Sequence, residues 1–144
     1  MLTMILALVA APHLCDVPSR YQTSGMNDRE IAATASAIEA WNQKAIEAGG
    51  RTLYLLDSAR GSPLGLHVRR SSYGLHTSLM VDDDGCITRA DVYIPARLGL
   101  TYDVLVRAIA KQIGLASGGR ENNRYDSIFG SGMITREDAQ EVMP

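Results

Sequence analysis

Two cationic residues, Arg107 and Lys111, lie four positions apart in a segment with apolar periodicity. Residues four apart occupy one face of an α-helix, so this spacing predicts that the two charges lie side by side. A guanidinium and an ammonium on one face can bind a carboxylate or a phosphate, and Arg120 and Arg124 follow in the next loop. Anion binding is therefore the first chemistry that the sequence offers.

Metal chemistry has little support among the histidines of the chain. His13, His67 and His76 lie on three separate predicted segments and form no ligand spacing such as His-x-x-x-His. Zinc sites are built from imidazole, thiolate and carboxylate groups, usually at short spacings. Each histidine is therefore expected to be an ordinary strand or loop residue.

Three other patterns with catalytic or binding potential are better explained as turns or strands. The acidic run 82–85 lacks the later ligands of a calcium loop and is typical of a hairpin turn. Ser71-Ser72 and Ser78 have no adjacent base that could activate a nucleophile. Gly118-Gly119-Arg120 follows a helix, whereas a phosphate loop precedes one. We therefore predict no catalytic constellation.

The elements that position these residues follow from hydrophobic periodicity and turn chemistry. Asn27, with Glu30 three residues later, is close to a capping box. Apolar residues then follow at spacings of three and four, which predicts an amphipathic helix that ends at Gly49-Gly50. Extended segments are expected at 51–56, 64–69, 75–81 and 87–94, the last two joined by the hairpin turn.

Two more helices are expected after the strands. Thr101 can cap a helix that ends near Gly114, and Thr135 with Asp138 opens a short last helix. An irregular loop, 118–132, separates them. Strands gathered between two helices predict an α+β fold, in which a twisted mixed sheet packs against two main helices and a short C-terminal one.

Composition favours a single folded domain. The chain has 144 residues, of which 46% are apolar and 21% charged, as is usual for a globular protein. We assign this domain to residues 12–144. The net charge of −2 gives no electrostatic reason to expect nucleic acid or a membrane surface as a partner.

Two features bear on the compartment of the protein. Residues 1–11 form an apolar segment, too short to span a bilayer, that resembles the apolar part of a secretory signal and favours a secreted or periplasmic location. No Lys or Arg precedes it and Pro12 would hinder cleavage, so a first β-strand or a mis-assigned start in a cytoplasmic protein is the alternative. Cys15 and Cys86 are compatible with one disulfide or with two buried thiols.

Five local patterns occur in a fixed order along nearly the whole chain. They are Ile38-Glu39-Ala40-Trp41-Asn42, the strand 85–94, the apolar frame of 105–117, Ser127-Ile128-Phe129 and Thr135-Arg136-Glu137-Asp138. In this order they resemble the catalytic domain of matrixin-like metzincins, zinc proteases with the signature His-Glu-x-x-His-x-x-Gly-x-x-His. The resemblance implies a zincin-like fold.

The chain departs from the family at the positions that carry its chemistry. Gly114 matches the glycine of the signature. The replaced positions are Arg107, Lys111 and Ser117 for the three zinc ligands, Ala108 for the general base and Phe129 for the methionine beneath the zinc. An arginine does not lose its proton to become a ligand, and two cations repel a dication. The resemblance therefore implies a scaffold without zinc, cofactor or catalytic residues.

We accordingly expect an inactive, metzincin-like domain that binds an extended polypeptide or has a structural role. Metzincins hold their substrate as an additional strand along a sheet edge, and strand addition needs backbone groups and no metal. The matching edge in this chain is the segment 75–81. Its alternating positions Leu75, Thr77, Leu79 and Val81 are the candidate binding residues.

Two other functions are open at the level of sequence. An active metal-dependent peptidase or other hydrolase with a non-standard site would need ligands from other segments. An anion-binding module would use Arg107 and Lys111. However, polar groups that line the cavity of a lost metal need hydrogen-bond or ion-pair partners. This favours an internal ion pair of these cations with Glu121, Asp126 or Asp91.

Overall fold

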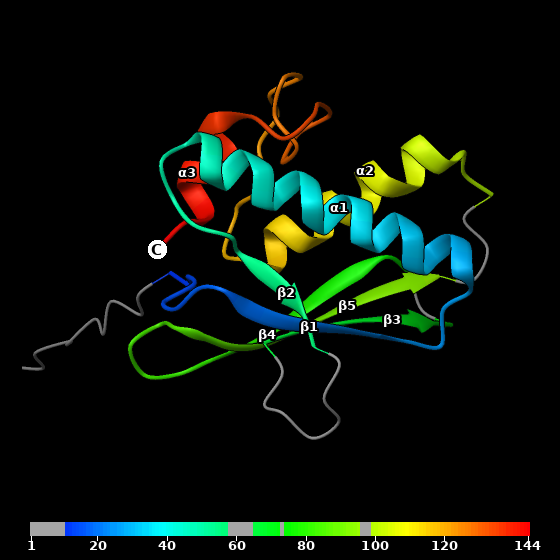
Figure 1. Ribbon diagram of the computed structural model, residues 1–144, viewed down its shortest axis with the longest axis horizontal. Coiled ribbons are helices and arrows are strands. Elements are labelled where there is room, and N and C mark those ends of the chain that lie inside the picture. The colour runs from blue at the N-terminus through cyan, green and yellow to red at the C-terminus, as the bar shows by residue number, and fades with distance from the viewer. Residues whose placement is uncertain (1–10, 58–64, 73, 96–98) are drawn as a thin grey trace, which may run out of the picture.

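The computed structural model describes residues 11–57, 65–72, 74–95 and 99–144 as a five-stranded sheet and three helices. In chain order the elements are β1 (Ser19–Ser24), α1 (Asp28–Glu47), β2 (Tyr54–Leu56), β3 (Leu66–Ser71), β4 (His76–Val81), β5 (Ile87–Pro95), α2 (Tyr102–Ala116) and α3 (Arg136–Val142). Helices α1 and α2 cover one face of the sheet (Figure 1). The predicted α+β class and the mixed sheet with two main helices and a short last one are confirmed.

The sheet has the strand order β2-β1-β3-β5-β4. β1 runs parallel to β2 and β3, and β3 runs parallel to β5, whereas β4 is antiparallel to β5. Because side chains alternate along a strand, the face toward the helices carries the buried residues of β3 and β5, namely Leu66, Val68, Ala90, Val92 and Ile94. The segment predicted as the binding edge is thus an edge strand, β4.

The first strand, β1, is missing from the elements that the sequence predicts. Its six residues, SRYQTS, are mostly polar, and among them Tyr21 is the buried one. The strand forms because its backbone pairs on both sides, with β2 and with β3, so its hydrogen bonds do not require an apolar alternation. Residues 1–10, the predicted signal segment, lie outside the described part of the chain.

Both predicted capping boxes are formed. Asn27 Oδ1 accepts a hydrogen bond from Glu30 N at 2.9 Å, and Glu30 Oε1 accepts one from Asn27 N at 3.0 Å. Thr135 and Asp138 make the same reciprocal pair at the start of α3. Thr101 precedes α2 in an extended conformation, but its side chain makes no capping hydrogen bond.

A side chain of α1 binds the backbone at the start of β2. Asn42 Oδ1 accepts hydrogen bonds from Leu53 N at 2.9 Å and Tyr54 N at 3.0 Å, and its Nδ2 donates to Tyr54 O at 2.8 Å. Leu53 O accepts from Ser19 N of β1 at 2.8 Å, so Asn42 and β1 together bind the backbone at the start of β2, which begins at Tyr54 instead of at residue 51. The other three predicted strands are confirmed as β3, β4 and β5.

Cys15 and Cys86 form a disulfide, so two free thiols are excluded in this state. The bridge joins the segment before β1 to the turn between β4 and β5, across 71 residues. In the chain-entropy description, closing a loop of this length stabilises the fold by about 4 kcal/mol. The described residues before β1, 11–18, are therefore part of the folded domain.

Helices α1 and α2 pack together at Gly114. A Cβ at this position would lie 2.5 Å from Trp41 Cζ2 and 2.6 Å from Phe129 Cε1. The fully buried Trp41 donates from Nε1 to Ala110 O at 2.7 Å, and its ring centroid is 5.8 Å from that of Phe129. The glycine serves close packing and does not end the helix, so α2 continues to Ala116, beyond the predicted end.

Replacing Gly114 by alanine is expected to lower the free energy of unfolding by about 1–3 kcal/mol, the usual cost of overpacking a core. The sign of this change in the free energy of unfolding is informative, because glycine-to-alanine in an exposed helix stabilises the fold by about 1 kcal/mol. Urea unfolding followed by tryptophan fluorescence measures the difference. Phe129→Leu should lower the free energy of unfolding by less in the Gly114→Ala variant than in the unaltered protein, because the smaller side chain makes room for the new methyl group. A Gly114→Ala variant of equal or higher stability would contradict the close contact.

Candidate functional site

Helix α2 presents Arg107 and Lys111 on one side, as their spacing predicts. Arg107 is exposed, and Lys111 is half-buried. Both line a hollow of about 260 Å³ together with Ala108 and the loop residues 130–132. Lys111 Nζ lies 3.4 Å from the backbone oxygen of Gly130, beyond the usual range of a good hydrogen bond.

Two further positions that the sequence resemblance aligns with a zinc site, Ser117 and Phe129, are buried structural residues. Ser117 is 1% exposed, and its hydroxyl donates to Ile113 O at 2.7 Å and accepts from the Tyr54 hydroxyl at 2.6 Å. Burial raises the pKa of Tyr54 to about 12, against a smaller lowering by the bond with Ser117, so the phenol stays a neutral donor. Phe129 is fully buried in the core.

The expected internal ion pair of the α2 cations is formed in part. Lys111 Nζ lies 3.9 Å from Glu121 Oε1, and the two side chains are 30% and 70% exposed. Exposed pairs of this kind stabilise a fold by about 0–1 kcal/mol. Arg107 has no hydrogen-bond or ion-pair partner within the described residues. Within the described residues, the positive charges of Arg107 and Lys111 are therefore only weakly compensated by acidic or hydrogen-bonding partners.

The remaining predicted partners of these cations lie elsewhere. Arg124 donates to both carboxylate oxygens of Asp126, at 3.0 and 2.9 Å. Asp91 is held by two arginines of the sheet. The expectation that Asp126 or Asp91 pairs with the α2 cations is thus wrong, and neither Arg120 nor Arg124 lines their hollow.

A buried carboxylate holds the loop beside this hollow. Asp138, 2% exposed, accepts hydrogen bonds from Ser127 Oγ at 2.6 Å and from the backbone of Ile128 and Thr135 at 3.0 Å each. Ser127 Oγ accepts in turn from Phe129 N at 3.1 Å. Because all of these groups leave water on folding, the path of the loop depends on this carboxylate.

A groove of about 310 Å³ lies between β4 and α2. It is lined by Leu75, His76, Thr77, Leu79, Gln112, Leu115 and Glu121. Leu75 and Leu79 are half-buried against the core, and Thr77 Oγ1 donates to Gln112 Oε1 at 2.8 Å. Val81 is exposed and follows a register shift at the end of β4, so it does not line the groove with the other three predicted residues.

The face of the sheet away from the helices carries a charged cluster that the sequence analysis missed. Asp91 Oδ1 lies 2.7 Å from Arg69 Nη2, and Asp91 Oδ2 lies 3.1 Å from Arg89 Nε. Burial raises the pKa of this carboxyl, but the hydrogen bonds from Arg89 and Arg69 outweigh burial and hold the pKa below its usual range. Burial and the nearby Arg69 lower the pKa of His67.

Aromatic rings extend this cluster toward β4. The Tyr93 ring stacks on His76 with centroids 4.5 Å apart, and the guanidinium of Arg69 lies 5.4 Å from the Tyr93 centroid. These residues share one face because Tyr93 is paired with Arg69 on β3 and with His76 on β4. Polar residues at every second position of the predicted strands were the available signal.

One group in the described part of the chain has the ligand types and spacing for a metal, and none of its members belongs to α2. It consists of His13, Cys15 and Cys86. The sequence predicts His13 to be a strand or loop residue, because the three histidines lie on separate segments and have no ligand spacing.

Comparison with known proteins leaves the family open. No family model matches the chain, and no characterised protein is significantly similar to it. Among the described residues no helix is both long and apolar enough to cross a membrane.

Two single substitutions should show that the buried carboxylate of Asp138 contributes more to stability than the surface charge of Lys111. Asp138→Ala is expected to lower the free energy of unfolding by about 2–4 kcal/mol, because it leaves buried donors without an acceptor. Lys111→Ala should change it by less than about 1 kcal/mol. Thermal and urea unfolding measure both effects, with Glu137→Ala as an exposed acidic control on α3. A Lys111→Ala loss as large as that of Asp138→Ala would contradict the weak pairing described above.

Proposed function

We propose that this protein is a catalytically inactive domain with a zincin-like, matrixin-like scaffold that binds an extended polypeptide along β4. The observation that carries the proposal is the groove between β4 and α2. β4 is the last strand of the sheet, so one side of its backbone has no partner strand among the described residues. An additional strand can use such an edge through main-chain hydrogen bonds.

The lining of the groove favours a polypeptide with apolar side chains at alternate positions. Leu75, Leu79 and Leu115 offer half-buried apolar surface beside the strand. Glu121, at 70% side-chain exposure, adds a negative charge to the same groove. Main-chain hydrogen bonds would supply the affinity for a bound strand. These groove side chains would select among polypeptide sequences, as in other edge-strand complexes.

The order and packing of the elements support the scaffold part of the proposal. The helix with Trp41, the hairpin strand β5, helix α2 and the last helix follow one another as the resemblance implies. Phe129 lies against Gly114, the glycine that matches the metzincin signature. The two cations on α2, where the family has zinc ligands, favour an inactive domain.

We also propose that the protein is secreted or periplasmic, with a cytoplasmic location as the alternative. The disulfide between Cys15 and Cys86 supports export, because such bonds persist in oxidising compartments.

Anion binding on α2 is the second candidate function. Its supporting observation is that Arg107 and Lys111 line one hollow with Ser131, and that Arg107 lacks a partner within the described residues. A carboxylate or phosphate there could accept from both cations. Protection of the fold by inorganic phosphate, lost in Arg107→Ala, would favour this function over polypeptide binding.

The oxidised protein, exposed to zinc and then freed of excess metal, should retain well below one zinc per chain. The reason is that two positive charges stand at the positions of the family's first two ligands. Elemental analysis measures the content. The double variant Arg107→His, Lys111→His places two imidazoles at the same spacing and should retain more. One zinc per unaltered chain would favour the alternative of an active hydrolase and would call for protease assays.

Strand addition along β4 can be tested with a labelled, permanently unfolded polypeptide such as carboxymethylated α-lactalbumin. Saturable binding, measured by fluorescence anisotropy, is expected. Neighbouring residues of a strand direct their N–H groups to opposite sides, so Thr77→Pro and Ser78→Pro form a matched pair. Thr77→Val is the reference for Thr77→Pro, because it also lacks the hydroxyl that donates to Gln112. Relative to its reference, the proline that faces away from β5 should leave the melting temperature nearly unchanged and weaken binding about tenfold, the effect of one or two backbone hydrogen bonds.

The other proline of the pair should lower the melting temperature, because it removes a bond between β4 and β5. The melting temperatures therefore identify which variant reports on the free edge. Unchanged binding in the variant that keeps its stability would contradict strand addition along β4.

A further inference from the structure

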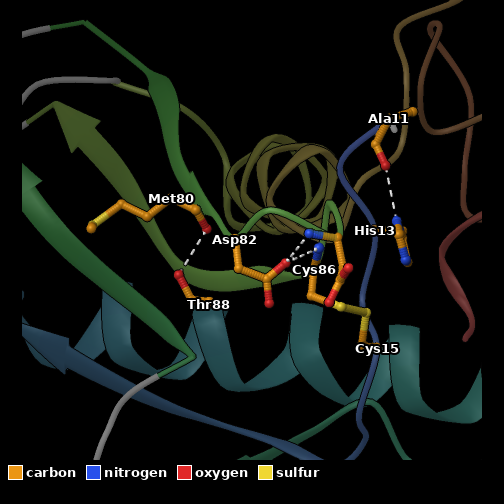
Figure 2. The surroundings of a disulfide bond; sticks show 8 residues. Ala11, His13, Cys15, Met80, Asp82, Cys86 and Thr88 are labelled. Carbon is orange, nitrogen blue, oxygen red and sulfur yellow. Dashed lines mark hydrogen bonds between the residues drawn. A yellow bond between two sulfur atoms is a disulfide. The ribbon is translucent and has the colours of Figure 1, made fainter. Parts of the chain in front are cut away.

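An imidazole and two sulfurs gather where the N-terminal segment crosses the turn between β4 and β5. One ligand atom from each of His13, Cys15 and Cys86 lies within 4.8 Å of the others. His13 is exposed, and the two cysteines are half-buried. Figure 2 shows His13 beside the disulfide, with one ring nitrogen directed to the backbone oxygen of Ala11.

The environment of His13 prepares it to act as a ligand. Its Nδ1 lies 2.9 Å from Ala11 O. A carbonyl oxygen only accepts hydrogen bonds, so Nδ1 carries a proton, and in the neutral ring the lone pair is then on Nε2. Metal-binding histidines typically have this arrangement, in which the second ring nitrogen donates to a backbone carbonyl.

Backbone hydrogen bonds hold the three residues together independently of the disulfide. His13 N donates to Gly85 O at 3.0 Å, and Ile87 N donates to His13 O at 2.9 Å. Asp82 Oδ1 accepts from Cys86 N at 2.9 Å and so fixes the turn that carries this cysteine. The positions of the ligands therefore do not depend on the sulfur–sulfur bond alone.

Open space and charged side chains lie next to the two cysteines. A hollow of about 590 Å³ opens beside them, on a lining that does not include His13. Its charged lining residues in the described part of the chain are Asp16, Asp82 and Arg20, so carboxylates outnumber the guanidinium. Opposite charge in this position favours a cation at the sulfurs.

We propose that reduction of the disulfide converts this cluster into a zinc site with two thiolates and one imidazole. In the oxidised protein the sulfurs are bonded to each other and are not thiolate ligands. A tetrahedral zinc with Zn–S bonds of about 2.3 Å separates two thiolates by about 3.8 Å. The Cα atoms of Cys15 and Cys86 are 5.5 Å apart, which allows this separation after side-chain rotation. Water completes the coordination.

The conversion balances with a phosphine as reductant. The phosphine gives two electrons to the sulfur–sulfur bond and takes oxygen from one water to become a phosphine oxide, and the two sulfurs take up two protons as thiols. Zinc then displaces both thiol protons as it binds. The proposal is independent of polypeptide binding along β4, because the groove and this cluster share no residue.

The test compares oxidised and phosphine-reduced full-length protein, freed of reductant without oxygen. Zinc is titrated in competition with a chromogenic chelator, and cobalt replaces zinc in a parallel sample to show thiolate charge-transfer absorption. One zinc per reduced chain and none per oxidised chain is the expected result. His13→Ala should weaken zinc binding by about 10- to 100-fold or more, since loss of a group that merely supports a ligand has this effect.

The matched control is His76→Ala, which removes another exposed histidine and should leave zinc affinity unchanged. Emission of the buried Trp41 reports the fold in every sample. A reduced chain that unfolds and refolds on addition of zinc supports the site, because metal then binds the native state. Equal zinc affinity in His13→Ala, equal binding by the oxidised chain, or a reduced chain that zinc does not bind would overturn it.

Discussion

The close packing of α2 against α1 at Gly114 fixes the geometry on which both candidate binding surfaces depend. Trp41 fills the space beside this glycine and donates to the backbone of α2 at Ala110. Phe129 closes the same space from the loop that follows α2. Because α2 cannot rotate about its axis without moving the buried rings of Trp41 and Phe129, this packing determines the direction of the other side chains on α2.

Two consequences follow for the surface. With Gly114 directed inward, Arg107 is exposed and Lys111 is half-buried beside the loop 130–132. Gln112 is directed to β4 and accepts from Thr77. The packing of α2 at Gly114 therefore places two cations on one side of the helix and the contact with the edge strand β4 on another.

Patterns of short range in the sequence predict much of this fold. The capping boxes at Asn27 and Thr135 are formed, because each depends on residues three positions apart. The hairpin of β4 and β5 likewise follows from alternation and an acidic turn. β1 could not be predicted in this way, because its polar residues are held by pairing with β2 and β3, which are distant in the chain.

The candidate sites show the same limit. The spacing of Arg107 and Lys111 predicts their common face, but Ser117 is drawn into the core by a hydrogen bond to Tyr54, 63 residues away. The cluster around Asp91 and the group of His13 with the cysteines both join separate segments. Such sites depend on sheet register and chain crossing, which no local spacing encodes.

The disulfide and the edge strand are mechanically related, since Cys86 ends the turn that begins after β4. At this end, the bridge to Cys15 and the bonds of His13 fasten the hairpin to the N-terminal segment. Along its length, Thr77 fastens β4 to α2. An edge strand held in this way loses little conformational freedom when a further strand pairs with it, and that reduces the entropic cost of binding. Release of the turn from Cys15 would leave both the bonds of His13 and the Thr77 contact in place, so the hairpin and its groove stay fastened at two points.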